Sequence, residues 1–342
     1  MSIDLSILIP TWDRPEEVNK RLREIDNIWQ GAVKIIIQVN PGNYNASNID
    51  TSLHRGTTIL QQNNHNFGLI GNICYGITRV DTPWLWILGD DDKVRTDANS
   101  QIDQAIRLAN EHSAMGVLFN QWHRGATEKD HPILSRSIET LLESSSFGDM
   151  LFISGFVWRF SFFQENLSIF LDYAYSCASH TLILLASQAE GRSTIAIIDY
   201  PLIDYEYAVT WSRLVYLQRI TSIFIYPSLR PFAIRSKLTD ILWPHCRWAL
   251  LSAAHDQLKH GEITMADWYG AAVTLSLHAL SSSKLKTALA RIIDILLIPL
   301  EIYSPWYLIS LPIKKSVNFF RGLLRPARRS RRGVKSIEQR SC

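Results

Sequence analysis

An apolar run that ends in three carboxylates constrains this chain more than any other feature. Residues 84–88 (WLWIL) are all apolar and show no polar alternation, which is typical of a strand buried on both faces of a helix-covered parallel sheet. Gly89 follows and frees the backbone to turn, and Asp90, Asp91 and Asp92 come directly after it. The run therefore predicts a central strand with an acidic carboxyl end.

Three neighbouring carboxylates repel one another unless a cation neutralises them. Ligands of open α/β sheets bind at the carboxyl ends of the strands, which is where this acidic run is expected. A hard divalent cation, Mg²⁺ or Mn²⁺, that bridges the carboxylates to a diphosphate fits this chemistry. The alternative is a simple acidic turn that caps the helix beginning near Asp97.

Apolar strands and amphipathic helices alternate on both sides of the acidic run. The apolar pattern predicts strands at 3–9, 33–39, 57–61, 115–119, 152–159 and 195–202. It predicts helices from Pro15 with a buried stripe at Val18, Leu22, Ile25 and Ile28, through Ile73 and Ile77, and at 97–110 and 182–189. Successive strand–helix units require right-handed crossovers, so we expect an α/β fold with a mostly parallel sheet flanked by helices. Further helices at 241–259 and 265–280 predict a helical C-terminal region.

Three motifs occur in a characteristic order: SILIPTWDRP at 6–15, N-x-G-x-x-G-N-x-x-x-G at 66–76, and WLWILGDDD at 84–92. In this order they resemble the family 2 glycosyltransferases, and most closely the abequosyltransferase-like branch that builds bacterial surface polysaccharides. The resemblance covers about the first 120 residues and thins out beyond about 210. It implies the nucleotide-binding fold called GT-A.

The resemblance also implies a set of site residues. Asp92 and Asp90 would hold Mg²⁺ or Mn²⁺, and the nucleotide-sugar donor would contact Pro10, Thr11, Asp13, Asn40, Asn66, Gly68, Asn72, Asp90 and Asp91. One position departs from the family pattern, because Asn40 stands where many members carry Asp at the end of the second strand. Its amide offers both a donor and an acceptor to a nucleobase edge.

Inverting transfer needs a base that takes the proton from the acceptor hydroxyl. His180 has an ordinary pKa near neutrality, and relatives carry an acceptor-side catalytic residue at its place in the chain. Many relatives use an Asp instead, which makes Asp172 the rival. A third interpretation is that His180 is a helix-start residue satisfied by backbone hydrogen bonds.

The C-terminal end of the chain is strongly basic. Residues 314–342 carry ten Lys/Arg against one Glu, so the net charge of +3 leaves −6 on residues 1–313. Residues 289–313 are apolar but interrupted by charges and prolines, which argues against a membrane span. Together these segments predict interfacial helices and a basic tail on the anionic inner face of the cell membrane. The alternative is a packing helix followed by a disordered tail.

These observations predict three parts: a GT-A domain at 1–211, a helical region at 212–287, and membrane-interface helices with the tail at 288–342. The N-terminus shows no secretory signal, so we expect a cytoplasmic enzyme. The leading hypothesis is an inverting transferase that acts on a saccharide acceptor; the resemblance implies a lipid-linked one, because the acceptors of many such enzymes are lipid-linked.

Two other functions were weighed. A sugar-1-phosphate nucleotidyltransferase needs a glycine-rich loop after the first strand, but the first glycine is Gly31. A non-enzymatic protein that binds an anionic polymer would use the basic tail; because the body is acidic, we expect no nucleic-acid partner. Sequence patterns do not name the sugar, nucleotide, acceptor or linkage.

Overall fold

The computed structural model describes residues 4–121, 132–176, 178–204 and, with short gaps, 219–252, 265–282 and 287–295. Its contacts divide the chain into two compact units, residues 1–249 and 250–342. The domain limits expected from the sequence, at 211 and 287, remain predictions.

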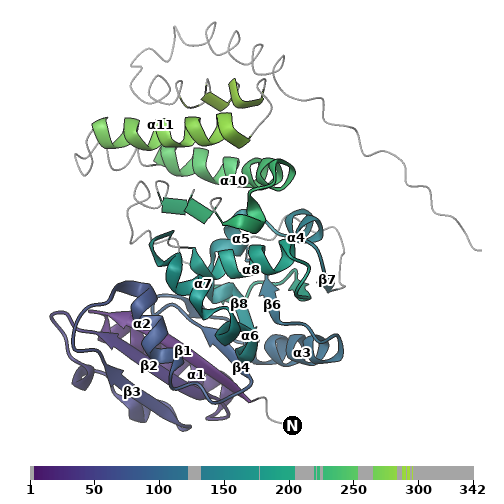
Figure 1. The fold of residues 1–342 in the computed structure, drawn as a ribbon. Coiled ribbons are helices and arrows are strands. Elements are labelled where there is room, and N and C mark those ends of the chain that lie inside the picture. Colours follow the sequence, from purple (N-terminus) through teal and green to yellow (C-terminus); the bar gives the residue numbers. More distant parts are fainter. Residues whose placement is uncertain are drawn as a thin grey trace, which may run out of the picture. The chain divides into compact units, whose positions relative to one another are not determined.

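The first unit is built on an eight-stranded sheet with the strand order β3-β2-β1-β4-β8-β6-β9-β7 (Figure 1). Strand β1 pairs in parallel with both β2 and β4, β2 with β3, and β6 with β9, whereas β8 and β7 run antiparallel to their neighbours. The strands are β1 (Leu5–Trp12), β2 (Lys34–Asn40), β3 (Thr58–Gln62), β4 (Trp84–Ile87), β6 (Gly116–Phe119), β7 (Ile133–Ser135), β8 (Phe156–Arg159) and β9 (Ile195–Ile198). The expected mostly parallel sheet is confirmed.

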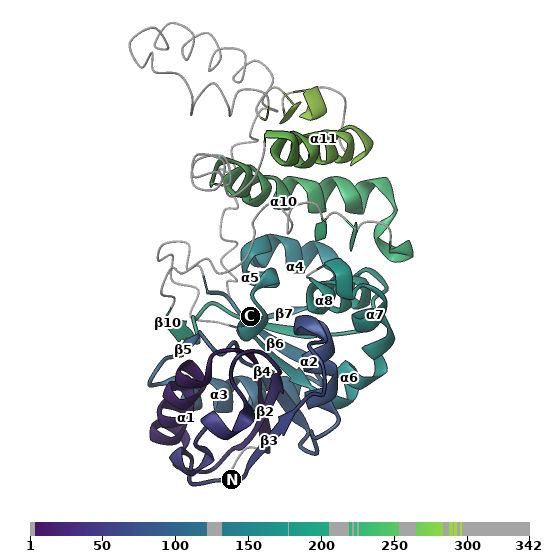
Figure 2. The same ribbon diagram turned by 90° about the vertical axis from the view of Figure 1, so that its left-hand side faces the viewer.

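A second, two-stranded sheet pairs β5 (Lys93–Val94) with β10 (Ile203–Asp204) in antiparallel fashion, directly after the acidic run (Figure 2). Short 3₁₀ helices occur in the connections. They are Ala46–Asn48, Thr51–Leu53, Ile153–Gly155, Ala174–Ser176 and Pro227–Leu229.

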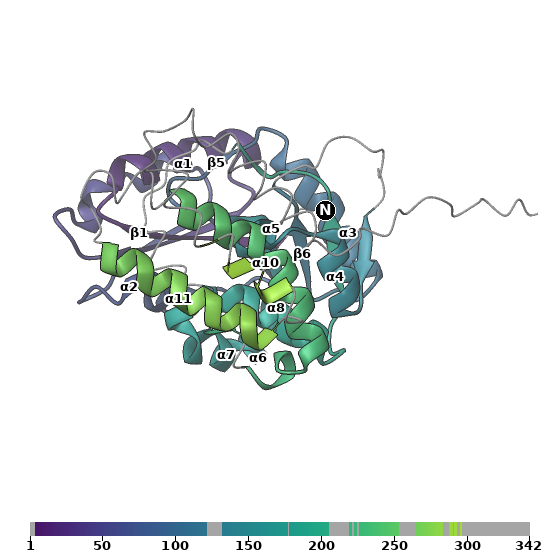
Figure 3. The ribbon, with the colours of Figure 1, turned by 90° about the horizontal axis from the view of Figure 1, so that it is seen from above.

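Helices cover both faces of the large sheet. Helices α1 and α3 lie on one face, and α2, α6 and α7 lie on the other (Figure 3). Within residues 4–204, the helices that the structure describes are α1 (Pro15–Trp29), α2 (Gly68–Ile77), α3 (Ala98–Glu111), α4 (Ile138–Ser144), α5 (Phe147–Leu151), α6 (Phe160–Glu165), α7 (Leu167–Asp172) and α8 (Ser179–Ala189). The stripe predicted for α1 is confirmed at Val18, Leu22 and Ile25, whereas Trp29 rather than Ile28 is fully enclosed.

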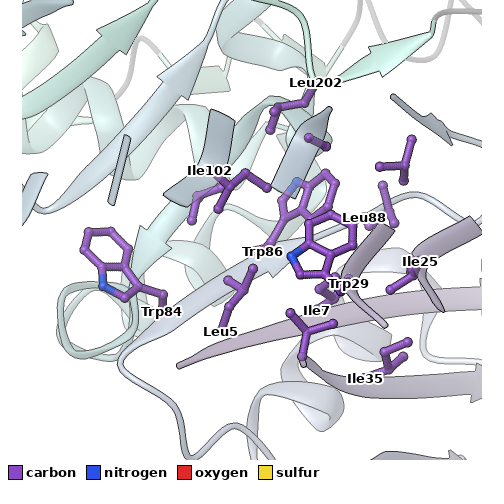
Figure 4. Close-up of a cluster of buried hydrophobic side chains, with 14 of the residues drawn as sticks. Leu5, Ile7, Ile25, Trp29, Ile35, Trp84, Trp86, Leu88, Ile102 and Leu202 are labelled. Carbon is purple, nitrogen blue, oxygen red and sulfur yellow. The ribbon is translucent and has the colours of Figure 1, made fainter. Parts of the chain in front are cut away.

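Strand β4 lies in the middle of this arrangement and is buried on both faces. Trp84, Trp86 and Leu88 join the core under α1 and α3, where the ring centroids of Trp29 and Trp86 lie 6.0 Å apart (Figure 4). The intervening residue Leu85 is also fully buried, on the opposite face. Burial of each large apolar side chain contributes about 1.5–3 kcal/mol, so this strand is a fixed support for the acidic residues that follow it.

Three strand boundaries differ from the expectation by three residues or more, and one of them belongs to the strand expected at 195–202, which ends at Ile198. Strand β1 continues through Pro10 to Trp12, because its last residues still pair with β2 after pairing with β4 has ended at Leu8. The strand expected at 152–159 begins only at Phe156, since 153–155 form a 3₁₀ turn. An apolar pattern shows which residues are buried but not where a neighbouring strand stops.

The helical C-terminal region is confirmed by α10 (Phe232–Ser252) and α11 (Met265–Ser282). In the second unit Trp268 is buried and donates from Nε1 to the Leu250 carbonyl at 3.2 Å. No helix in the described ranges is long and apolar enough to cross a membrane. The basic tail and most of 289–313 lie outside those ranges.

Candidate active site

The acidic run meets the end of strand β1. Since β1 and β4 are parallel neighbours with Leu8 opposite Ile87, the residues that follow both strands come out at the same edge of the sheet. Thr11 donates from Oγ1 to Oδ2 of Asp90 at 2.6 Å, across 79 positions of sequence. Both residues are buried. The motifs at 6–15 and 84–92 therefore meet at one edge of the sheet and form a single site.

Arg14 brings a protein cation into this site. Its Nη1 lies 2.7 Å from Oδ2 of Asp91 and 3.3 Å from Oδ1 of Asp90, so one guanidinium bridges two carboxylates. Burial opposes the charge on Arg14, but the two carboxylates outweigh that effect and raise its pKa. The arrangement shows that this pair of carboxylates accommodates a positive charge between them.

Asp92 is held against Gly89 and the segment that precedes β8. Its Oδ2 accepts a hydrogen bond of 2.5 Å from the Ser154 hydroxyl, and that hydroxyl accepts one of 2.9 Å from the Gly89 amide. A Cβ on Gly89 would lie 2.5 Å from Oδ2 of Asp92, so a larger residue there would displace the Asp92 carboxylate. Arg21, buried in α1, donates to the Asp92 carbonyl at 2.8 Å and fixes the backbone.

Burial controls the electrostatics of the acidic residues. It raises the pKa of Asp92 to about 6, with the charges of Asp91 and Asp90 adding to the effect and the Ser154 hydrogen bond opposing it. Burial likewise raises the pKa of Asp90, against the hydrogen bond from Thr11 and the charge of Arg14. A site that disfavours its own carboxylate charges in this way is one that a bound cation would stabilise.

A network of buried amides supports the strand ends beside the site. Asn63 accepts from Gln38 and donates to the side-chain oxygens of Asn40 and Asn72, each at 2.8 Å. Asn72 in turn donates to the Thr11 carbonyl at 3.1 Å and to the Gln38 carbonyl at 2.8 Å. Asn72 of the N-x-G-x-x-G-N motif therefore fixes the backbone position of Thr11.

Asn40 belongs to the same network. Its Oδ1 also accepts from the Phe67 amide at 3.3 Å, and its Nδ2 donates to the Gly68 carbonyl at 3.0 Å. The side chain is buried and its amide is occupied by protein partners. The expectation that this amide is open to a nucleobase is not met in this structure, and a contact between Asn40 and the donor stays a prediction.

The other predicted donor residues lie in the loops around this edge. Asp13 adopts a positive φ of 61° and accepts from Asn43 Nδ2 and the Tyr44 amide, which joins the loops after β1 and β2. Asn66 is exposed and accepts from the Gly68 amide at 2.9 Å. Pro10 is buried inside β1. These contacts shape the loops, and their roles toward a ligand remain predictions.

The two candidate bases differ sharply in exposure. His180 is buried at the start of α8 with Nε2 3.0 Å from the Leu151 carbonyl, and burial lowers its pKa to about 4. The ordinary pKa expected for His180 is therefore wrong, because helix α8 is enclosed along almost its whole length. Asp172 is exposed at the last position of α7.

The donor set suits a cation that is shared with a ligand. In the described parts of the chain, no group of three or more His, Cys, Asp or Glu side chains forms a ready-made metal site. Mg²⁺ and Mn²⁺ are often held by one or two carboxylates together with substrate phosphates. The carboxylates of Asp90, Asp91 and Asp92, which follow one strand directly, offer such a small set of oxygen ligands.

Sequence reasoning missed three residues that organise the site. Arg14 stands inside the first motif, but a lone basic residue after a strand does not reveal its partner 76 positions away. Ser154 and Asn63 lie in segments with no recognisable motif. The one available signal concerns Ser154, a polar residue in the otherwise apolar segment 152–158, which suggests a buried hydrogen-bonding role; Asn63 lies in a polar run and gives no such signal.

Comparisons with known proteins show what the fold of the chain resembles. No protein-family model matches the chain, and no curated protein matches it in sequence. Among solved structures, residues 1–349 of TarS from S. aureus superpose with a TM-score of 0.55 at 12% identity, over 86% of this chain and 89% of that one. The chain has the GT-A fold.

TarS in complex with UDP-GlcNAc also has a TM-score of 0.55, at 11% identity over 94% of this chain and 90% of that one. The mannosyltransferase PcManGT from Pyrobaculum calidifontis, solved with GDP-Man and Mn²⁺, aligns with a TM-score of 0.48 at 11% identity, over 95% and 86% of the two chains. The TarS matches confirm the predicted fold, whereas a place in the abequosyltransferase-like branch stays a prediction.

Proposed function

We propose that the protein is a metal-dependent inverting glycosyltransferase that moves a sugar from a nucleotide-sugar donor to a saccharide acceptor. One observation carries the proposal: Asp90 and Asp91 meet Thr11 and Arg14 at the carboxyl edge of β1 and β4 in a GT-A sheet, and Asp92 follows them directly in the chain. This is the edge at which open α/β sheets bind their ligands. The neighbour TarS has been solved with UDP-GlcNAc, which supports a nucleotide-sugar donor.

The side chains at this edge would divide the work between them. Asp90 and Asp92 would hold Mg²⁺ or Mn²⁺, which when bound neutralises charge that develops on a leaving diphosphate. Thr11 keeps the carboxylate of Asp90 in a single orientation. Arg14 is partly exposed and reaches both Asp90 and Asp91, so it is placed to pair with a donor phosphate as well.

For the base we favour Asp172 over His180. An acceptor hydroxyl must come within hydrogen-bonding distance of the base, and the buried ring of His180 is already paired with a backbone carbonyl. Its lowered pKa also makes it a weaker base at neutral pH. Asp172 is exposed and therefore accessible to an acceptor.

The acceptor that we propose is a lipid-linked saccharide of a bacterial surface polysaccharide, and the basic tail would hold the enzyme on the inner face of the membrane. Support comes from the ten Lys/Arg of residues 314–342 and the apolar segment that precedes them. Basic residues near an anionic leaflet contribute about 1 kcal/mol each, and interfacial apolar burial adds to them.

A screen of nucleotide sugars tests the central proposal. Thermal melting of the full-length chain is measured with UDP-, GDP-, CDP- and dTDP-sugars, with Mn²⁺ and with EDTA. We expect one donor class to raise the melting temperature only when Mn²⁺ is present, and the Asp90→Ala variant to show no such rise. If no donor stabilises the wild type, and the protein instead binds polyanions with a steep salt dependence, the transferase proposal fails.

A further inference from the structure

Ser154 is a fully buried residue that ties three parts of the acidic strand together. It lies in the 3₁₀ turn just before β8, the antiparallel neighbour of β4. Its carbonyl accepts from Nε1 of Trp86 at 2.8 Å, which anchors the backbone to the core. Its hydroxyl accepts from the Gly89 amide and donates to Oδ2 of Asp92. A hydroxyl has a single proton, and that of Ser154 is donated to Asp92. The two hydrogen bonds together therefore fix the rotamer of the Ser154 side chain.

Ser154 and Gly89 together fix the orientation of the Asp92 carboxylate. Its Oδ2 lies against the Gly89 backbone, where a Cβ would be 2.5 Å away, and is occupied by Ser154. In the described part of the chain, the other carboxylate oxygen, Oδ1, accepts no hydrogen bond. The carboxylate is therefore held by one oxygen, with the second left over for a ligand.

We propose that Ser154 is a positioning residue that orients Asp92 so that its Oδ1 binds the divalent cation. The proposal rests on the proposed function, because it presupposes a cation at the acidic run. Residues that hydrogen-bond to metal ligands fix the direction of the ligand, and their loss typically lowers metal affinity by about 10–100-fold. A merely structural serine would affect folding without affecting the metal.

Three variants of the full-length chain separate these possibilities. Ser154→Ala removes both hydroxyl bonds but keeps the Trp86 contact, which uses the backbone carbonyl. Ser154→Cys keeps a weak donor of similar size and should lie between Ala and the wild type. Ser187→Ala is the matched control: Ser187 is also fully buried with two hydroxyl hydrogen bonds, but it lies in α8 and bonds to Leu184 and Ser193.

The measurement is Mn²⁺ binding followed by electron paramagnetic resonance of the free ion. Each protein is titrated with Mn²⁺ alone and in the presence of UDP, GDP, CDP or dTDP, and circular dichroism reports folding. One of these nucleotides should tighten Mn²⁺ binding to the wild type. In its presence, we expect the Mn²⁺ dissociation constant of Ser154→Ala to be about tenfold or more higher than that of the wild type. Ser187→Ala should match the wild type.

Each other outcome is decisive. Equal Mn²⁺ affinity of Ser154→Ala and the wild type would overturn the role of Ser154 and leave the transferase proposal standing. Equal losses in Ser154→Ala and Ser187→Ala, with matching losses of thermal stability, would show a general effect of buried-serine removal and also overturn it. If the wild type binds Mn²⁺ with none of the nucleotides, the proposed function itself fails.

Discussion

Replacement of Asp92 by Asn offers a direct measure of the electrostatic cost of the acidic site. Burial raises the pKa of this carboxyl from 3.8 to about 6, so the folded protein resists the negative charge that the unfolded chain accepts. Asn has nearly the same shape, and its oxygen can still accept the hydrogen bond from Ser154. The substitution therefore removes the charge and keeps the local contact.

The size and the pH range of the effect follow from linkage. Between about pH 4 and 6 the folded state binds more protons than the unfolded state, so wild-type stability falls as the pH rises through this range. The difference between 3.8 and about 6 corresponds to about 3 kcal/mol, which is an upper limit because Asp92 is only partly buried. Asp92→Asn should thus be more stable than the wild type by up to about 3 kcal/mol at pH 8, and by less than about 1 kcal/mol at pH 4.

Urea unfolding in EDTA at both pH values gives the free energies. The control is Asp103→Asn, which breaks the salt bridge of 2.7 Å to Arg107 on the surface of α3 and should cost under about 1 kcal/mol. If Asp92→Asn is equally stable or less stable than the wild type at pH 8, the charge of Asp92 carries no burial cost and the reasoning is refuted. If the reasoning holds, Mn²⁺ added together with the nucleotide that tightens its binding should stabilise the wild type but not Asp92→Asn.

Four further results are expected. Asp90→Ala should abolish transfer in a radiolabelled-sugar assay while circular dichroism shows an intact fold; normal turnover at saturating Mn²⁺ would disprove the site. Asp172→Asn should lower kcat by about 10²–10⁴, as loss of a base does, whereas His180→Ala should mainly lower thermal stability; the reverse pattern would assign the base to His180. Asn63→Asp should lower the free energy of unfolding in urea by about 1–3 kcal/mol, because a carboxylate oxygen would face two amide oxygens; an unchanged free energy would show that these two hydrogen bonds do not stabilise the fold. Truncation after Ser283 should release the protein from anionic vesicles in co-sedimentation while donor binding persists, and a full-length chain that never binds vesicles would contradict the membrane role.

Much of the architecture could be predicted from apolar patterning. Apolar spacing predicted the central strand β4, the helix stripe of α1 and the helical C-terminal region. The spacing of apolar side chains distinguishes a strand from a helix and shows which face of it is buried. Strand direction was less accessible. Strand β8 runs antiparallel between β4 and β6, and an apolar run looks the same in either direction.

The sequence by itself determined that this chain carries a buried strand ending in three carboxylates, and it predicted a cation beside them. Only the tertiary structure decided how each carboxylate is used. The parallel register of β1 and β4 brings Thr11 and Arg14 to Asp90, while β8 delivers Ser154 to Asp92. Hydrogen-bond partners 62 to 79 positions apart depend on which strands lie side by side. Strand order comes from the packing of the whole sheet, whereas local patterns report only the burial of each segment.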